Sequence, residues 1–143
     1  MSASSILLVE DHEGFAKALL NMLGQNQNLH VVAVAESAEA ALRYLRETSV
    51  DLVLVDYSLP DMSGVNLLEA LLTEHPTIRC AMLSGHLSLQ HARRALEAGA
   101  RGYMIKDNPL GILNDIPRIL KGEIVVSEEL RSLGSNDLLT DFR

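Results

Sequence analysis

The chain has 143 residues, enough for one domain with a substantial core, and 48% of its residues are apolar. Its formal charge of −7 argues against nucleic-acid binding by this chain alone, because phosphate contacts need clustered Lys and Arg. No apolar run approaches the roughly 18 residues that cross a membrane, and the N-terminus lacks the basic segment of a signal peptide. The single cysteine, Cys80, excludes an internal disulfide, so we expect a cytoplasmic protein.

Short apolar runs alternate with amphipathic segments along the chain. The runs are continuous and rich in Val, Ile and Leu, which is typical of parallel strands covered on both faces. They predict strands over residues 5–10, 30–35, 51–56, 78–83 and 102–106. The segments between them have helical spacing and predict helices over residues 13–25, 37–47, 63–74, 87–98 and 109–121. This alternation predicts an α/β fold with one parallel sheet and helices on both faces.

Several residues mark where the helices begin and end. Ser37 and Ser63 are expected N-caps of the second and third helices. Asn108 precedes a proline and is expected to open the last helix. A second proline, Pro117, falls inside that helix and predicts a kink or a shortened helix near Leu113.

Carboxylates end two of the predicted strands. In "LVLVDYSLPDMSG" (52–64), Asp56 follows four apolar residues, and Glu10 and Asp11 end the first strand. Open parallel sheets bind ligands outside the carboxyl ends of their strands, so we expect these acids to be neighbours. They would repel one another unless a positive charge lies between them, and Mg²⁺ prefers such oxygen ligands. The plainer alternative is that Glu10 and Asp11 only cap the following helix.

Two further polar residues end the last two strands. Ser84 follows the fourth strand in "AMLSGH", and Lys106 ends the fifth in "GYMIKD". A hydroxyl, an ammonium and a cation at one edge would together hold a phosphoryl group. Phosphoryl transfer depends mainly on such positioning, and Asp56 would be the attacking carboxylate that forms an acyl phosphate.

The ordered motifs "LLVEDH", "DLVLVDYSLPDMSG", "MLSGH" and "GYMIKD" resemble the receiver domain of bacterial two-component response regulators. The resemblance covers residues 5 to about 121. It implies a CheY-like, doubly wound sheet of five parallel strands in the order 2-1-3-4-5 with five helices. The receiver domain would span residues 1–122.

The resemblance also implies roles for the acids. Asp56 would be the phosphorylated residue. Asp11 and the backbone carbonyl of Ser58 would be Mg²⁺ ligands, and Glu10 would act on the metal mainly through water. Glu10 stands where the family usually has Asp. The glutamate keeps the negative charge, but its longer side chain changes how far the carboxylate reaches. An aspartate-nucleophile phosphatase, by contrast, would need a second Asp at position 58.

The remaining motif residues would serve the phosphoryl group and the switch. Ser84 and Lys106 match the hydroxyl and lysine of the family, and Tyr103 matches the aromatic that turns inward on activation. His86 is either a residue that tunes loss of the phosphoryl group or an ordinary loop histidine. Many receivers have proline after the lysine with a cis bond; here Asp107 follows, so the sequence leaves that bond open.

The implied function is a phosphoacceptor switch rather than an enzyme with an external substrate. A histidine kinase or phosphotransfer protein would donate the phosphoryl group in a Mg²⁺-dependent step. The face of the fourth helix, fifth strand and fifth helix would then bind an output domain or partner protein, and a homodimer would form there on phosphorylation. The alternative is an unphosphorylated pseudo-receiver that acts as a protein-interaction module.

The end of the chain suggests a subgroup. "KGEIVVSEEL" resembles receivers of the NarL/LuxR type, which precede a helix-turn-helix domain. Residues 123–143 are expected to be a linker or tail, and "NDLLTDFR" (136–143) resembles the start of such a DNA-binding domain. A short tail on a single-domain receiver is the alternative. In both cases we expect no binding to nucleic acid or membrane by this chain alone.

Overall fold

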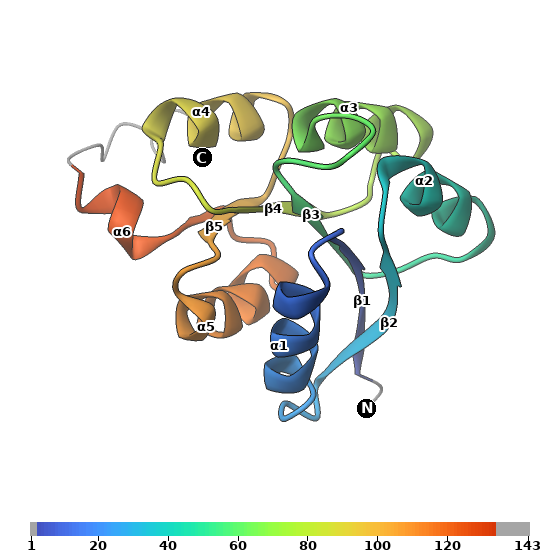
Figure 1. Cartoon of the computed structure of the whole chain (residues 1–143), viewed down its shortest axis with the longest axis horizontal. Coiled ribbons are helices and arrows are strands. Elements are labelled where there is room, and N and C mark those ends of the chain that lie inside the picture. The colour runs from blue at the N-terminus through green and yellow to red at the C-terminus, as the bar shows by residue number, and fades with distance from the viewer. Residues whose placement is uncertain (1–2, 134–143) are drawn as a thin grey trace.

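The computed structural model describes residues 3–133 and contains one parallel sheet (Figure 1). Its strand order is β2-β1-β3-β4-β5-β6, and every neighbouring pair is parallel. The predicted order of the first five strands is confirmed, whereas the predicted number is wrong because a sixth strand joins the edge. The strands are β1 (Ser4–Val9), β2 (Leu29–Ala35), β3 (Leu52–Asp56), β4 (Cys80–Ser84), β5 (Gly102–Ile105) and β6 (Val125–Val126).

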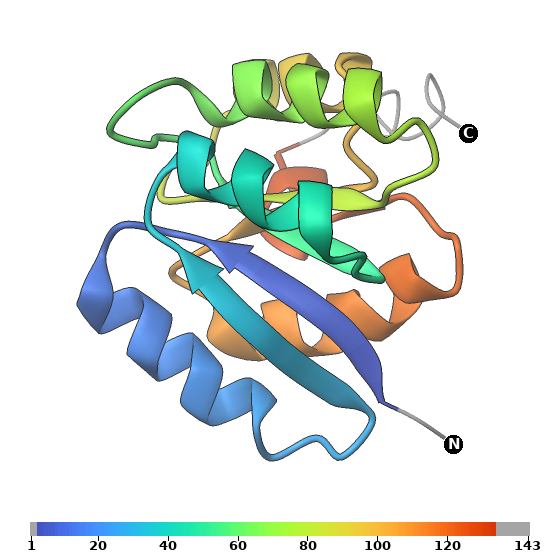
Figure 2. The same cartoon turned by 90° about the vertical axis from the view of Figure 1, so that its right-hand side faces the viewer.

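Helices cover both faces of this sheet. They are α1 (Glu13–Leu23), α2 (Ala38–Glu47), α3 (Gly64–Glu74), α4 (Leu89–Glu97), α5 (Pro109–Leu120) and the short α6 (Glu128–Arg131). Helices α2, α3 and α4 lie on one face, and α1 and α5 lie on the other (Figures 1 and 2). Alternate strand residues serve the two cores: Leu7 packs on the α2–α4 side, while Ile6 and Leu8 pack on the α1 and α5 side.

The predicted helix starts are confirmed, and of the two effects predicted for Pro117 the shortening does not occur. The side chains of Ser37, Ser63 and Asn108 each accept a backbone N–H in the first turn of the helix that they cap. Helix α5 continues through Pro117 to Leu120, so it does not shorten near Leu113. Proline removes one backbone donor, but Ile116 and Ile119 are fully buried and hold that turn against the sheet.

The segment after α5 belongs to the same sheet. β6 pairs with β5 through Val125 and Val126, both buried, and Leu130 of α6 is 0% exposed in the α2–α4 core. The sheet therefore extends beyond residue 122, where the sequence predicts the receiver domain to end. The resemblance of "NDLLTDFR" concerns residues outside the described part of the chain. None of the described helices is long and apolar enough to cross a membrane.

The burial of Leu130 yields a test of whether α6 contributes to stability. Leu130→Ala removes a fully buried side chain and leaves a cavity, so we expect the free energy of unfolding to fall by about 2–4 kcal/mol. Urea denaturation measures this. Leu133→Ala, at a position that is 53% exposed, is the matched control and should change stability by less than about 0.5 kcal/mol. Equal stability of the two variants would show that α6 does not pack as described.

Candidate functional site

Three carboxylates meet at the carboxyl ends of β1 and β3. Carboxylate oxygens of Glu10, Asp11 and Asp56 lie within 4.8 Å of one another. Glu10 and Asp56 are buried, at 1% and 5% exposure, while Asp11 is exposed. The plainer alternative does not hold for α1, because His12 caps that helix: its Nδ1 accepts the Phe15 N–H at 3.0 Å. The acids therefore come together as the strand ends predict.

The chain around Asp56 explains how this carboxylate is held. All of β3 is buried, and the Tyr57 N–H donates to the Leu83 carbonyl at 2.8 Å, which ties the strand end to β4. The following loop returns to the strand, where the Gly64 N–H donates to the Tyr57 carbonyl at 2.8 Å. A Cβ at Gly64 would collide with the Asp56 carbonyl oxygen and the Met82 methyl group. Only glycine allows the loop to close this tightly behind Asp56.

Lys106 joins two of the acids from the end of β5. Its Nζ lies 2.6 Å from Glu10 Oε1 and 3.2 Å from Asp56 Oδ2. Its backbone N–H donates to the Ser84 carbonyl at 2.9 Å, so β5 carries the ammonium to the same sheet edge. Nζ also lies 4.8 Å from the centroid of the Phe15 ring, a cation–π contact. The predicted meeting of Lys106 with the acids is thus present.

The electrostatic balance at Asp56 is unfavourable for its charge. Burial is the largest effect and raises the pKa of Asp56 to about 6, assisted by the hydrogen bond and negative charge of Glu10. The Ser58 N–H, which donates to Asp56 Oδ1 at 3.1 Å, and the Lys106 ammonium both lower the pKa. The raising effects prevail. One ammonium therefore does not compensate the acids that converge on it.

This donor set suits a hard divalent cation. Three carboxylates with oxygens in mutual reach match the preference of Mg²⁺ for oxygen ligands, and the exposed Asp11 leaves room for water. Ser58 lies in the loop after Asp56, and its backbone N–H donates a hydrogen bond to the Asp56 carboxylate. The expected ligation by its carbonyl oxygen stays a prediction.

Ser84 and Tyr103 hold the same loop residue from two sides. Ser84 is 1% exposed, and its Oγ accepts the His86 N–H at 3.0 Å. Tyr103 is fully buried, and its hydroxyl donates to the His86 carbonyl at 3.0 Å. Burial raises the pKa of Tyr103, partly offset by a hydrogen bond with Ser84. The side chain of His86 is exposed at this loop, and its tuning role is untested. The Lys106–Asp107 bond, which the sequence leaves open, is trans.

The structure adds contacts that the sequence does not predict. The Tyr57 ring stacks on His91 of α4, with centroids 4.6 Å apart and an interplanar angle of 13°. In the β3–α3 loop, Asp61 accepts the N–H groups of Ala38 and Glu39 at 2.9 and 3.0 Å, which lowers its pKa. Tyr57 follows Asp56 directly, and Asp61 lies in the same loop. Their positions in the loop after Asp56 are the only sign in the sequence that Tyr57 and Asp61 matter. The sequence does not indicate that Tyr57 contacts α4 or that Asp61 contacts the start of α2.

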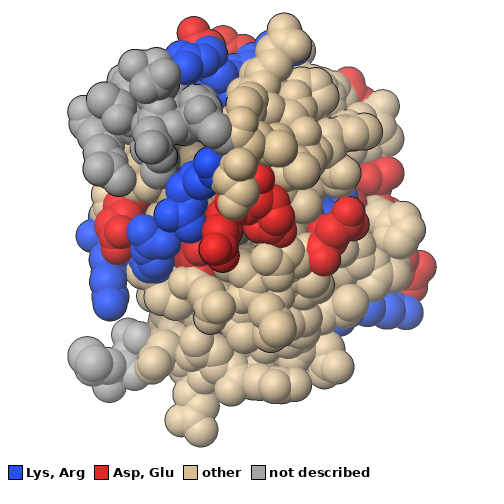
Figure 3. Space-filling view, turned by 90° about the vertical axis from the view of Figure 1, so that its left-hand side faces the viewer, with Lys and Arg blue, Asp and Glu red and all other residues tan. Residues whose placement is uncertain are grey.

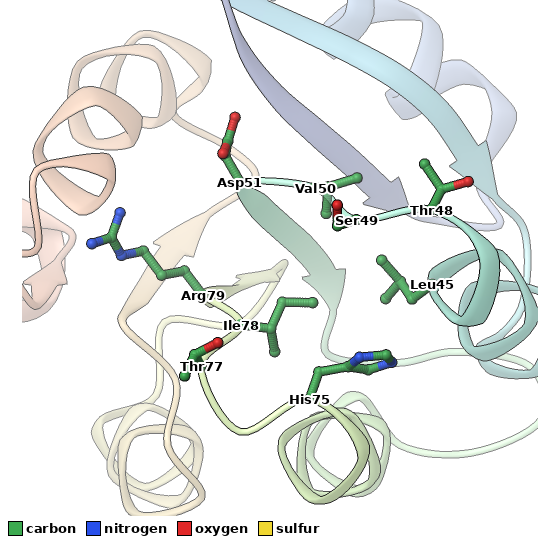
Figure 4. A pocket seen from close by; sticks show the side chains of 9 residues that line it. All are labelled: Leu45, Thr48, Ser49, Val50, Asp51, His75, Thr77, Ile78 and Arg79. Atoms are coloured by element: carbon green, nitrogen blue, oxygen red, sulfur yellow. The ribbon is translucent and has the colours of Figure 1, made fainter.

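A pocket of about 330 Å³ lies at the amino ends of β3 and β4, away from the acids (Figure 4). Its charged groups are already engaged. Asp51 accepts the N–H of Ser5 at 2.7 Å, and Arg79 Nη1 donates to the Leu120 carbonyl at 2.8 Å. These contacts join β1 to the residue before β3, and the residue before β4 to the end of α5. The carboxyl ends of the strands remain the candidate functional site.

The raised pKa of Asp56 yields a stability prediction. Above pH 6 the folded protein holds this carboxylate charged against the cost of burial, whereas in the unfolded chain it ionises near its ordinary value. Asp56→Asn removes that cost, so without divalent metal at pH 7.5 we expect the variant to be more stable by about 1–3 kcal/mol. At pH 5, where Asp56 is largely protonated in the folded state, the difference should shrink. Denaturant titrations at the two pH values measure it.

The matched control is Asp107→Asn, since Asp107 is exposed and next to Lys106 in the chain. It should change stability by less than about 0.5 kcal/mol at both pH values. If Asp56→Asn destabilises the protein at pH 7.5, the ion pair with Lys106 outweighs the cost of burial.

Comparisons with known proteins agree with this geometry. Residues 6–116 match the family model of the response regulator receiver domain. The chain is 31% identical over 137 residues to the Fimbriae Z protein of Salmonella typhimurium, covering 95% of this chain and 65% of that protein. It is 35% identical over 126 residues to the transcriptional activator protein ExaE of Pseudomonas putida, covering 87% and 59%.

A solved structure has the same fold. The two-component response regulator of the LuxR family from Aurantimonas sp. SI85-9A1 is 30% identical, with a TM-score of 0.87 over 92% of this chain and 94% of that one. The chain spans less than two thirds of the length of each of the two curated relatives. Because the family model covers well over half of the chain, this protein belongs to the response regulator receiver domain family.

Proposed function

We propose that this chain is a phosphorylation-activated receiver of a two-component system, with Asp56 as the phosphoacceptor. The observation that carries the proposal is the convergence of Glu10, Asp11, Asp56 and Lys106 at one sheet edge. The donor would be a phosphohistidine on a histidine kinase or phosphotransfer protein.

The proposed step is a displacement at phosphorus. An Asp56 carboxylate oxygen forms the new O–P bond while the N–P bond to the donor histidine breaks, and that nitrogen takes up a proton. Asp56 must be ionised to attack, and its pKa of about 6 leaves it mostly ionised at neutral pH. Mg²⁺ held by Asp11, Asp56 and the backbone carbonyl of Ser58, with Glu10 acting mainly through water, would neutralise charge on the phosphoryl oxygens.

Lys106 and Ser84 would then hold the transferred group. Lys106 already contacts Asp56 Oδ2 at 3.2 Å, so its ammonium is in place for a phosphoryl oxygen. The Ser84 hydroxyl would donate to a second phosphoryl oxygen. Movement of Ser84 toward the phosphoryl group would weaken the hydrogen bond that Ser84 Oγ accepts from the His86 N–H. That movement is the proposed origin of the switch, and the side chain of Tyr103 on β5 would change position as Ser84 moves.

The proposed output surface is the face of α4, β5 and α5. A partner protein or an output domain would bind there when Asp56 is phosphorylated, and a homodimer would use the same region. Control of transcription is proposed from the names of relatives such as the transcriptional activator ExaE, which are longer than this chain. The cytoplasm, where phosphodonors and reduced thiols occur, is the proposed location.

Intact-protein mass spectrometry tests the acceptor. After incubation with acetyl phosphate and Mg²⁺, we expect wild type to gain one phosphoryl group and Asp56→Asn to gain none. Removing Mg²⁺ with EDTA should abolish the gain. Asp107→Asn, which keeps all site carboxylates, is the control and should react like wild type. Folded wild type that gains no phosphoryl group from any donor would favour the interaction-module alternative.

The rate of the same reaction tests Lys106. Lys106→Met keeps an apolar stem but removes the charge that faces Asp56, so we expect phosphorylation to slow by about 100-fold. Time-resolved mass spectra give the rate. Lys121→Met, at an exposed position in the turn after α5, should leave the rate unchanged. A Lys106→Met rate within about threefold of wild type would remove Lys106 from the proposed machinery.

A further inference from the structure

A second polar pocket, of about 210 Å³, lies between the end of β5, helix α5 and helix α6. It is separate from the carboxylate site. Its lining includes the carboxylates of Asp115, Glu128 and Glu129, the hydroxyl of Ser127 and the guanidinium of Arg131. Apolar residues of β5 and α5, including Ile105 and Ile112, also line it.

Two residues that line this pocket each have a buried side-chain oxygen without a hydrogen-bond partner. Ser127 is only 5% exposed, and its Oγ makes no hydrogen bond within the described chain. Glu129 Oε1 is also buried there without a hydrogen-bond partner. Leaving a buried polar atom unpaired costs about 1–3 kcal/mol, more for a charged group. A hydrogen-bond donor seated between these two lining residues would satisfy their unpaired oxygens.

The pocket also has an excess of negative charge. Three carboxylates line it against one guanidinium, that of Arg131. The neighbouring Arg118 lies 3.9 Å from Asp115 Oδ1, but its guanidinium makes the shorter contact, 3.0 Å, with Glu123. Burial raises the pKa of Asp115, and Glu129 and Glu128 raise it further against the effects of the two arginines. A donor that enters this pocket should therefore be cationic.

The arrangement fits an organic cation better than a metal ion. Among the described residues, the acids whose ligand atoms lie within metal-binding reach of one another are Glu10, Asp11 and Asp56, not those of this pocket. A guanidinium is flat and carries several N–H donors in a fixed fork, so it can reach separated acceptors at once. Figure 3, seen from the side where α6 lies in Figure 1, shows acidic side chains gathered beside a row of basic ones.

We propose that the α5–α6 pocket binds the guanidinium of an arginine side chain presented by a partner protein. The occupant follows from charge complementarity and from the unpaired acceptors of Ser127 and Glu129. The proposal stands on this pocket alone and does not depend on phosphorylation of Asp56.

The test is a titration with N-acetyl-arginine amide, which imitates an arginine within a peptide, followed by ¹H–¹⁵N NMR of the full chain. We expect saturable shifts centred on Asn114, Ser127 and Glu129, with a dissociation constant on the order of 1 mM. N-acetyl-citrulline amide has nearly the same shape without the charge and should produce no saturable shifts. Nα-acetyl-lysine amide, which carries the charge without the planar guanidinium, should bind at least several-fold more weakly than the arginine compound.

Variants separate this pocket from the rest of the acidic surface. Glu129→Gln and Asp115→Asn should each weaken binding at least about fivefold, while Glu69→Gln, an exposed acid on α3, should leave it unchanged. The spectra themselves report whether each variant is folded. Shifts centred on Asp56, equal binding of the citrulline compound or of the lysine compound, or full binding by Glu129→Gln would each overturn the proposal.

Discussion

The arrangement of the candidate site depends on the way a single ammonium is shared between buried carboxylates. Lys106 Nζ contacts both Glu10 and Asp56, which arrive from two different strands, while the lysine arrives from a third. The charges remain unequal, and burial keeps the pKa of Asp56 at about 6. A phosphoryl group would add further negative charge to this edge. It can be held there only with additional positive charge, so the same imbalance accounts for both the metal preference and the metal dependence of the proposed reaction.

The other side of the site is organised by hydrogen bonds rather than charge. Ser84 accepts the N–H of His86, and Tyr103 donates to the carbonyl of the same residue. The β4–α4 loop is therefore held at one point by two groups from neighbouring strands. The Tyr57–His91 stack adds a direct contact between the residue after Asp56 and helix α4. A displacement of Ser84 would release one of the two hydrogen bonds that hold His86, while this stack would still join α4 to the loop after Asp56.

The sequence predicts the parts of this arrangement that follow from strand ends. Continuous apolar runs identify β1 and β3, and the geometry of parallel sheets then brings Glu10 and Asp56 together without any side-chain detail. β6 and α6 escape prediction because two and four residues are too short to show a period. The predicted shortening at Pro117 does not occur, since tertiary packing outweighs the lost hydrogen bond. The stack of Tyr57 on His91 depends on side-chain orientation across two elements, which a linear pattern does not contain.

Strand β5 connects the carboxylate site with the α5–α6 pocket. It carries Tyr103, and Lys106 follows its last residue, Ile105, which lines the α5–α6 pocket. β6 extends the connection, because the Ser127 N–H donates to the Tyr103 carbonyl at 3.0 Å. A cation in the pocket would thus lie against the backbone that positions both Tyr103 and Lys106. If occupancy of the pocket changes the equilibrium constant for phosphorylation of Asp56, thermodynamic reciprocity requires phosphorylation to change the affinity of the pocket by the same factor. If β5 stays fixed, the two sites act independently despite sharing a strand.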